Sequence, residues 1–308
     1  MLHCGVFIFS SSVASINLAK RLAHNDKKVR DSSIKSLRKW LLRRSELDDV
    51  SLMKIWKGLF YCFWMSDKVP IQQALAESVS DLLLPPLPFE RGLLLFKTGL
   101  ITLRREWTSI DQLRMDKFMT LVRRLIHRAF LMIQVNNFES AQVEALADCI
   151  LETHVVATDT QVRGFAFHFI DCFLEELERI HSSNEVNQLP FDGLNTLLTP
   201  FYHILARAED ETLVNRTKKE VFDKLRELCF TPLPAPKMEK SKKQGKKQVE
   251  EEEEEEVQLE GLTAELPYLH QLVHDNAESI AAVFEEMAKD TSVEQRGQTS
   301  SWMNNWDV

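Results

Sequence analysis

Apolar residues recur at three- and four-residue spacing along most of the chain, and polar turns interrupt them about every 20 to 25 residues. This spacing is typical of amphipathic α-helices, because 3.6 residues complete one helical turn. The pattern predicts helices near residues 16–24, 27–44, 48–65, 69–84, 88–104, 112–135, 138–156, 160–181, 189–208 and 211–229. Antiparallel helix pairs of this size stack into solenoids. We therefore expect an all-α fold, a HEAT/armadillo-like α-solenoid in preference to an irregular helical bundle.

The sequence changes character after the last of these helices. In residues 231–260, "TPLPAPK" ends the helical pattern, "KMEKSKKQGKK" is a lysine cluster and Glu250 to Glu256 is an unbroken acidic run. A segment of this composition cannot form a core, which predicts a disordered, flexible linker. Residues 261–308 contain one more helical pattern, interrupted at Pro267, and a polar tail. That segment either packs back on the helical domain of residues 17–230 or hangs free, and residues 1–16 are an uncertain amino-terminal extension.

The stretch "KIWKGLFYCFWMSDK", residues 54–68, is unusually aromatic. On a helical wheel one broad face is apolar and comprises Leu52, Ile55, Trp56, Leu59, Phe60 and Phe63. The opposite face carries Lys54, Lys57, Gly58 and Tyr61. Stacking on nucleic-acid bases would require rings that point outward beside arginines, which this pattern does not provide. We therefore expect a buried inner helix, with Gly58 allowing a neighbouring helix to approach closely.

Charge is distributed unevenly along the chain, although the formal net charge is only −8. Residues 1–130 contain 22 lysines and arginines against 12 aspartates and glutamates, a net charge of +10. Residues 131–230 and residues 231–308 each contain 8 against 17, a net charge of −9. A basic amino-terminal part is typical of a protein that binds a polyanion such as RNA, or an acidic protein surface.

Two predicted helices concentrate this positive charge. In the first, residues 115–133, Phe118, Leu121, Val122, Leu125, Ile126, Ala129 and Ile133 share one side, and basic residues line the other. The second is "KKVRDSSIKSLRKWLLRR", residues 27–44. The candidate RNA or partner contacts are Lys35, Arg38, Lys39, Arg43, Arg44, Arg114, Lys117, Arg123, Arg124 and Arg128. The alternative is an ordinary solvated face, on which His127 also lies.

A third basic cluster lies in the linker and comprises Lys240, Lys242, Lys243, Lys246 and Lys247. Short basic runs of this kind serve as nuclear import signals, so we expect a nuclear protein. A solvated linker without such a role is the alternative. No stretch approaches the 18 apolar residues that a membrane-spanning helix requires, so no membrane partner is expected.

The sequence carries no motif for catalysis or for cofactor binding. Nucleotide loops of the GxxxxGK[ST] and GxGxxG types, HExxH and GxSxG are all absent. The five cysteines are scattered without a CxxC pair, which favours reduced thiols in the cytosol or nucleus. We therefore expect no enzyme, no cofactor, no metal and no small-molecule substrate.

Two groups of side chains could still be drawn as sites. His270 and His274 have the spacing of two metal ligands on one helical turn, but lack an evident third ligand. His168, Asp171 and Glu175 share the polar face of one predicted helix and could form a hydrolase site. Exposed polar faces commonly have this composition, so neither group is expected to be functional.

Several local motifs occur together and in order. They are "LMKIWKGLFYCFWMSDK" (52–68), "REWTSIDQLRMDKFMTLVR" (105–123), "RGFAFHFIDCFLEEL" (163–177) and "LLTPFYHILARAEDETL" (197–213). With "LAKRLAHNDKKVRDSSIKSLRKWL" (18–41), they resemble the ribosomal RNA-processing protein 1 family of nucleolar proteins over residues 17 to about 230. The motif positions carried over are Trp56, Lys57, Gly58, Trp64, Asp67, Lys68, Arg105, Glu106, Trp107, Asp111, Arg114, Asp116, Lys117 and Phe118.

The resemblance implies a nucleolar assembly factor with an all-helical, HEAT-like fold. Members of that family join early precursors of the large ribosomal subunit and are needed for processing of spacer-containing precursor rRNA, yet are not themselves the nucleases. The expected function is therefore a noncatalytic scaffold on early pre-60S particles, with assembly factors and precursor rRNA as partners. The tail is shorter and more acidic than the basic extensions of many members. The alternative is a helical-repeat adaptor that binds only proteins, for instance in nuclear transport.

Overall fold

The computed structural model describes residues 15–44, 47–153, 163–182, 187–233 and 266–290. Within these ranges every regular element is a helix, so the prediction of an all-α fold is confirmed. Outside the described residues lie residues 234–260 of the predicted linker, with the lysine cluster at 240–247, and residues 1–14 of the amino-terminal extension. None of the described helices is both long enough and apolar enough to cross a membrane.

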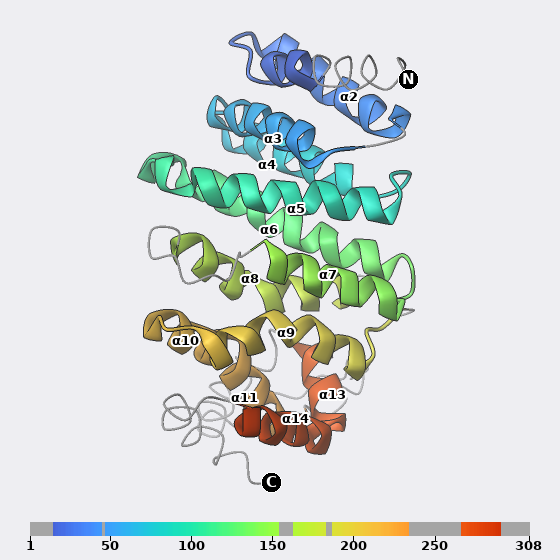
Figure 1. Cartoon of the computed structure of the whole chain (residues 1–308), viewed down its shortest axis with the longest axis vertical. Helices are drawn as coiled ribbons and strands as arrows, with labels where there is room; N and C mark the ends of the chain where they lie inside the picture. Colours follow the sequence, from blue (N-terminus) through green and yellow to red (C-terminus); the bar gives the residue numbers. More distant parts are fainter. Residues whose placement is uncertain (1–14, 45–46, 154–162, 183–186, 234–265, 291–308) are drawn as a thin grey trace, which may run out of the picture.

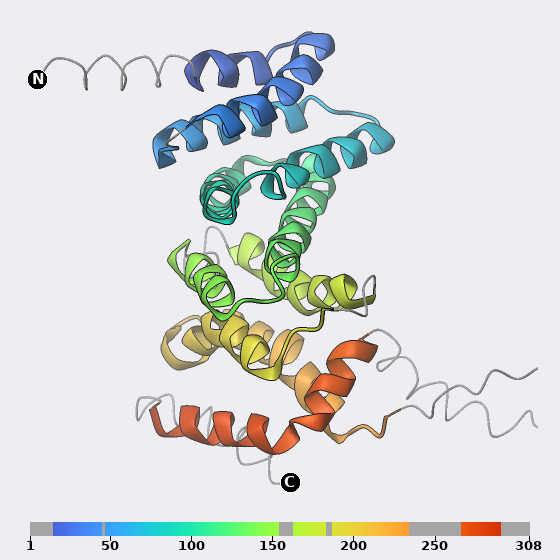
Figure 2. The same cartoon turned by 90° about the vertical axis from the view of Figure 1, so that its right-hand side faces the viewer.

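The helices form two rows that run along the long axis of the molecule (Figures 1 and 2). The most extensive contacts join helices that are two positions apart in the chain. One row contains α3 (Asp49–Trp64), α5 (Phe89–Glu106), α7 (Ser140–Glu152) and α9 (Phe191–Arg207). The other contains α4 (Val69–Ser80), α6 (Gln112–Gln134), α8 (Arg163–Ser182) and α10 (Glu211–Thr217). A helix over residues 15–22 and α2 (Lys27–Arg43) begin the stack.

One continuous apolar core joins the two rows from Leu18 to Ile280. The predicted apolar face of the aromatic stretch is buried, and Trp56 and Phe63 are each 1% exposed. A side chain at Gly58 would place its Cβ 2.6 Å from the carbonyl oxygen of Ala19, so only glycine permits this close packing. The predictions of an inner helix and of close approach at Gly58 are both confirmed.

Helix ends differ from the predicted boundaries for local reasons. The helix predicted to reach residue 84 ends at Ser80 and continues only as the 3-10 turn η1 (Asp81–Leu83), just before two prolines. The helix predicted from residue 138 begins at Ser140, because Asn137 and Phe138 have positive φ angles. The last predicted helix is interrupted by the π-helical segment η4 (Lys218–Asp223) before α11 (Lys224–Phe230).

The carboxy-terminal helical pattern packs back on the stack. Pro267 does not interrupt a helix there but begins one, α13 (Pro267–Asp275), because proline at a first helical position forfeits no hydrogen bond. The carboxylate of Glu178 on α8 accepts hydrogen bonds from the amides of Tyr268 and Leu269, at 3.0 and 2.9 Å. Of the two arrangements left open by the sequence, α13 therefore adopts the packed one, and α14 (Ala277–Asp290) follows beside α9.

The docking of α13 is expected to weaken in acid through His181. Its ring is stacked 3.7 Å from that of Tyr268, and neither ring nitrogen has a hydrogen-bond partner within the described residues. Burial lowers the pKa of His181 from 6.5 to about 4. Between these two values the unfolded chain binds a proton that the folded chain does not, so the free energy of unfolding falls as pH falls, by up to about 3 kcal/mol.

Urea titrations at pH 7 and pH 4.5 measure this effect. The His181→Phe variant is the control, because it keeps the stacked ring and removes the titration. The loss of stability on acidification should be larger for the wild type than for the variant. Equal losses would show that His181 does not titrate in this window.

Candidate interaction surface

Helix α2 carries the exposed part of the predicted basic surface. Asp26 caps its amino terminus by accepting from the Lys28 amide at 2.8 Å, and Leu37 and Leu41 are buried. Lys35, Lys39 and Arg43 are exposed and have no side-chain partner among the described residues. Three fixed, unpaired cations on one rigid helix are available to an anionic partner.

Two other predicted cations of α2 also make contacts within the molecule. Arg38 is exposed but donates to the carbonyl oxygen of Asp81 at 2.7 Å, which ties α2 to the end of α4. The guanidinium of Arg44 lies 5.3 Å from the centre of the Trp40 ring, in cation–π geometry. Arg38 therefore helps to hold α2 in place, whereas the contact of Arg44 is local to the carboxy-terminal end of α2.

The other predicted basic stripe, on α6, is neutralised by neighbouring helices. Arg124 pairs with Glu77 of α4 at 2.6 Å. Arg128 pairs with Glu77 and with Asp81, each at 2.7 Å. The positive charges therefore lie between carboxylates instead of facing solvent unpaired, which a helical wheel of α6 alone could not indicate.

The other side of the stripe contacts α8. Arg123 pairs with Glu175 at 2.7 Å and with Glu176 at 3.0 Å. Burial opposes ionisation of Glu176, whose side chain is fully buried, but the neighbouring His127, Arg179 and Arg123 hold its pKa below the usual value. The three arginines of α6 thus join α4, α6 and α8 within one row.

Replacing both Arg124 and Arg128 with glutamine should destabilise the fold without weakening RNA binding. The two side chains make three ion pairs that link α4 to α6, and their loss should cost about 1–2 kcal/mol. Thermal unfolding measures the first effect, and titration of a labelled oligonucleotide measures the second. A large loss of RNA affinity in a variant that is still folded would show that RNA binds α6.

Lys117 and Arg114 are used within the protein. The Lys117 ammonium is buried and donates to the carbonyl oxygens of Trp64 and Ser66, each at 2.8 Å, where α3 ends. Burial lowers the pKa of Lys117. The guanidinium of Arg114 lies 4.7 Å from the centre of the Trp64 ring and pairs with Asp111, which also caps α6. Both cations therefore stabilise the junction of α3 and α6.

The remaining motif positions join helices to one another. The Trp56 indole donates to the carbonyl oxygen of Leu95 at 2.9 Å, and its ring fills the space where a Cβ at Gly99 would lie, 2.6 Å away. Lys57 forms an ion pair with Glu106, and Arg105 contacts the same carboxylate at 3.1 Å.

Motif residues farther along the chain also make contacts within the protein. The ring of Trp107 meets that of Phe165 edge to face at 4.9 Å, and Phe118 is fully buried. Asp67 and Lys68 are exposed in the turn between α3 and α4, and Asp116 is exposed on α6. Most of these motif positions are therefore explained by packing between helices.

The structure does not assemble the two groups that could be drawn as sites. His168 donates to the carbonyl oxygen of Met119 at 2.8 Å, Asp171 pairs with Arg216 at 2.5 Å, and Glu175 pairs with Arg123. His270 is buried and donates to the carbonyl oxygen of Thr231 at 2.9 Å. Within the described residues no group of three side chains could hold a metal ion.

The described cysteines are free and buried. Burial raises the pKa of the Cys62 and Cys229 thiols to about 11, and that of the Cys149 and Cys172 thiols to about 12. Thiols of this kind are protonated at neutral pH and are poor nucleophiles.

Comparison with known proteins decides the family. A family described as "Nucleolar protein, Nop52" matches residues 13–298, nearly the whole chain. The chain belongs to the Nop52 family. The prediction from the sequence motifs is therefore confirmed: the matching family is described as nucleolar, and its curated relatives are named as ribosomal RNA processing proteins.

Curated Nop52 relatives are considerably longer than this chain. It is 34% identical over 214 residues to "Ribosomal RNA processing protein 1 homolog A" of Homo sapiens, which covers 68% of the chain and 45% of the relative. It is 33% identical over 215 residues to homolog B of Mus musculus, and the alignment covers 68% of this chain and 29% of that relative. The homolog of Drosophila melanogaster is 31% identical over 214 residues, and the alignment covers 67% of this chain and 30% of that relative. The chain thus spans less than half the length of these relatives.

Proposed function

We propose that this chain is a noncatalytic scaffold on early precursors of the large ribosomal subunit, where it supports processing of precursor rRNA in the nucleolus. Membership of a nucleolar rRNA processing family carries this proposal. Its partners are pre-60S assembly factors and precursor rRNA. The contacts described above support a structural role. The polar side chains of His168, Asp171, Glu175 and His270 form hydrogen bonds or ion pairs within the protein.

The fold suits this role. The two rows, in which the most extensive contacts join helices two positions apart, support a HEAT-like solenoid of residues 17–230 extended by α13 and α14. A solenoid exposes long surfaces relative to its mass, so several factors can bind one chain simultaneously. The lysine cluster at 240–247, outside the described residues, is proposed as an import signal. Deletion of residues 237–247 should exclude the protein from the nucleus, and unchanged nuclear localisation would remove this assignment.

The RNA contact is proposed at α2. Of the predicted cations, Lys35, Lys39 and Arg43 are those that lie exposed and without a described partner. The arginines of α6 pair with carboxylates, and Lys117 is buried against backbone carbonyls. Ultraviolet crosslinking of the tagged protein in cells, followed by sequencing of bound RNA, tests the contact. Spacer-containing precursor rRNA should be recovered. Recovery of proteins without RNA would instead support the helical adaptor.

A further inference from the structure

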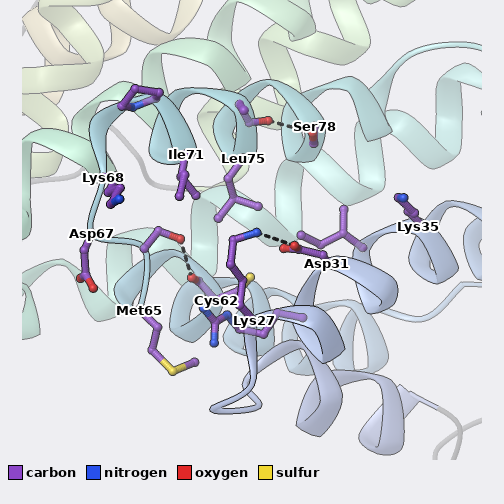
Figure 3. Close-up of a pocket in the computed structure, with 15 residues that line it drawn as sticks. Lys27, Asp31, Lys35, Cys62, Met65, Asp67, Lys68, Ile71, Leu75 and Ser78 are labelled. Carbon is purple, nitrogen blue, oxygen red and sulfur yellow. Dashed lines mark hydrogen bonds and ion pairs between the residues drawn. The ribbon is translucent and has the colours of Figure 1, made fainter.

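The row that contains α4, α6 and α8 has a gap at its amino-terminal end. Helix α4 packs along α6, and α6 packs along α8, but the contact between α2 and α4 is slight. Between α2, α4 and the α3–α4 turn lies a groove of about 660 Å³ (Figure 3). In a row of stacked helices this space would ordinarily be filled by side chains of adjacent helices.

Figure 3 shows how the groove is built. Ile71, Leu75 and Ser78 follow one another along α4, Lys27, Asp31 and Lys35 follow one another along α2, and the turn at Met65 to Lys68 closes one end.

The floor of the groove is aliphatic. It includes Ile34, Met65, Ile71 and Leu75, and the side chain of Ile71 is 37% exposed. The lining contains no phenylalanine, tyrosine or tryptophan. Aliphatic side chains cannot stack with bases, so this floor favours an apolar polypeptide side chain over single-stranded RNA.

The rim of the groove is positive. Lys35 on α2 and Lys68 at the start of α4 have no side-chain partner among the described residues. Lys27 is paired with Asp31 at 2.5 Å, and Asp67 is the other carboxylate of the lining. The two free ammonium groups thus outnumber the one free carboxylate, and α2 adds further exposed cations beyond the groove.

We propose that this groove binds an acidic amphipathic helix of a partner protein. Apolar side chains spaced three and four residues apart on that helix would cover the aliphatic floor. Its carboxylates would face Lys35 and Lys68, which gives charge complementarity and favours acidic over basic partners. The bound helix would supply the neighbour that α4 lacks. The inference rests on the proposed scaffold function and names the chemistry of one partner.

A defined probe tests the proposal with the full chain. The probe is a fluorescein-labelled synthetic 18-residue peptide with leucines along one helical face and glutamates elsewhere. A control peptide of the same composition has its leucines distributed around the helix. Fluorescence polarisation should give saturable binding of the first peptide, with a Kd on the order of tens of micromolar, and at least about tenfold weaker binding of the control peptide.

Variants locate the binding site. Ile71→Glu places a carboxylate in the floor and should raise the Kd at least about tenfold. Val50→Glu, on an exposed residue outside the groove, is the matched control and should leave the Kd unchanged. Thermal unfolding verifies that both variants are folded. Failure of the amphipathic peptide to bind, or equal binding by Ile71→Glu, would overturn the proposal.

The same variant separates this inference from the scaffold function. Ile71 is not among the proposed RNA contacts, so Ile71→Glu should leave crosslinking to precursor rRNA intact. If a uridine-rich oligonucleotide lost affinity for Ile71→Glu as the peptide does, the groove would belong to RNA and the proposal would fail. Displacement of the peptide by RNA without that loss would agree with both proposals, because both use Lys35. Loss of the peptide contact alone leaves the family-based function standing.

Discussion

Replacing Lys35 and Lys39 together with glutamate should weaken binding of single-stranded RNA at least about 25-fold at about 0.1 M salt. Each phosphate contact contributes about 0.7 to the dependence of log affinity on log salt, so two lost contacts remove about 1.4 logarithmic units between about 0.1 and 1 M salt. Repulsion by the new carboxylates adds to this loss. Titration of a labelled uridine-rich oligonucleotide at several salt concentrations measures both the affinity and the slope.

The matched control reverses two exposed cations at the opposite end of the stack, Arg207 and Lys219. It changes the net charge of the chain by the same amount, so any effect of overall charge appears in both variants. The slope should fall by about 1.4 only when Lys35 and Lys39 are replaced. Equal losses in the two variants would mean that RNA responds to total charge and that α2 is not a specific contact.

Truncation of Trp56 to alanine should lower the free energy of unfolding by about 3–5 kcal/mol. The indole is 1% exposed, lies against Gly99 and donates to the carbonyl oxygen of Leu95, so its removal leaves a cavity and deletes a buried hydrogen bond between the two helices. Urea unfolding followed by circular dichroism measures the change.

Tyr61 provides the control on the same helix. Its side chain is 43% exposed, so Tyr61→Ala should cost no more than about 1 kcal/mol. A small effect at Trp56 would contradict the conclusion that the motif tryptophan joins α3 to α5. Such a result would instead favour a binding role for the aromatic stretch, residues 54–68.

Periodicity was sufficient to predict the helices and their buried faces. Phe118, Leu121 and Leu125 recur at helical spacing and are all fully buried, as the wheel of α6 indicates. The same wheel could not identify the environment of the polar face. Arg128 meets Glu77 and Asp81, which precede it by 51 and 47 residues, and such pairs depend on how helices stack. Local pattern therefore predicts amphipathicity but not whether an exposed-looking cation is free.

Three other features could not be predicted from the sequence and were seen only in the tertiary structure. The π-helical segment at Lys218–Asp223 has no distinct apolar period, so the sequence predicted an uninterrupted helix. Glu178 stabilises α13 although it precedes Tyr268 by 90 residues in the chain, and no local sequence motif predicts this contact. The groove beside α4 arises because α2 packs only slightly on α4, whereas each helix alone has an ordinary amphipathic pattern.

A scaffold on precursors of the large subunit should be found in large, RNA-containing particles in nuclear extract. Gradient sedimentation of the tagged protein, with and without ribonuclease and with sequencing of RNA from the fast fractions, tests it. The protein should sediment with spacer-containing precursors of the large subunit and move to light fractions after ribonuclease treatment. A protein that remains in light, RNA-free fractions without ribonuclease would contradict the scaffold function and favour the adaptor.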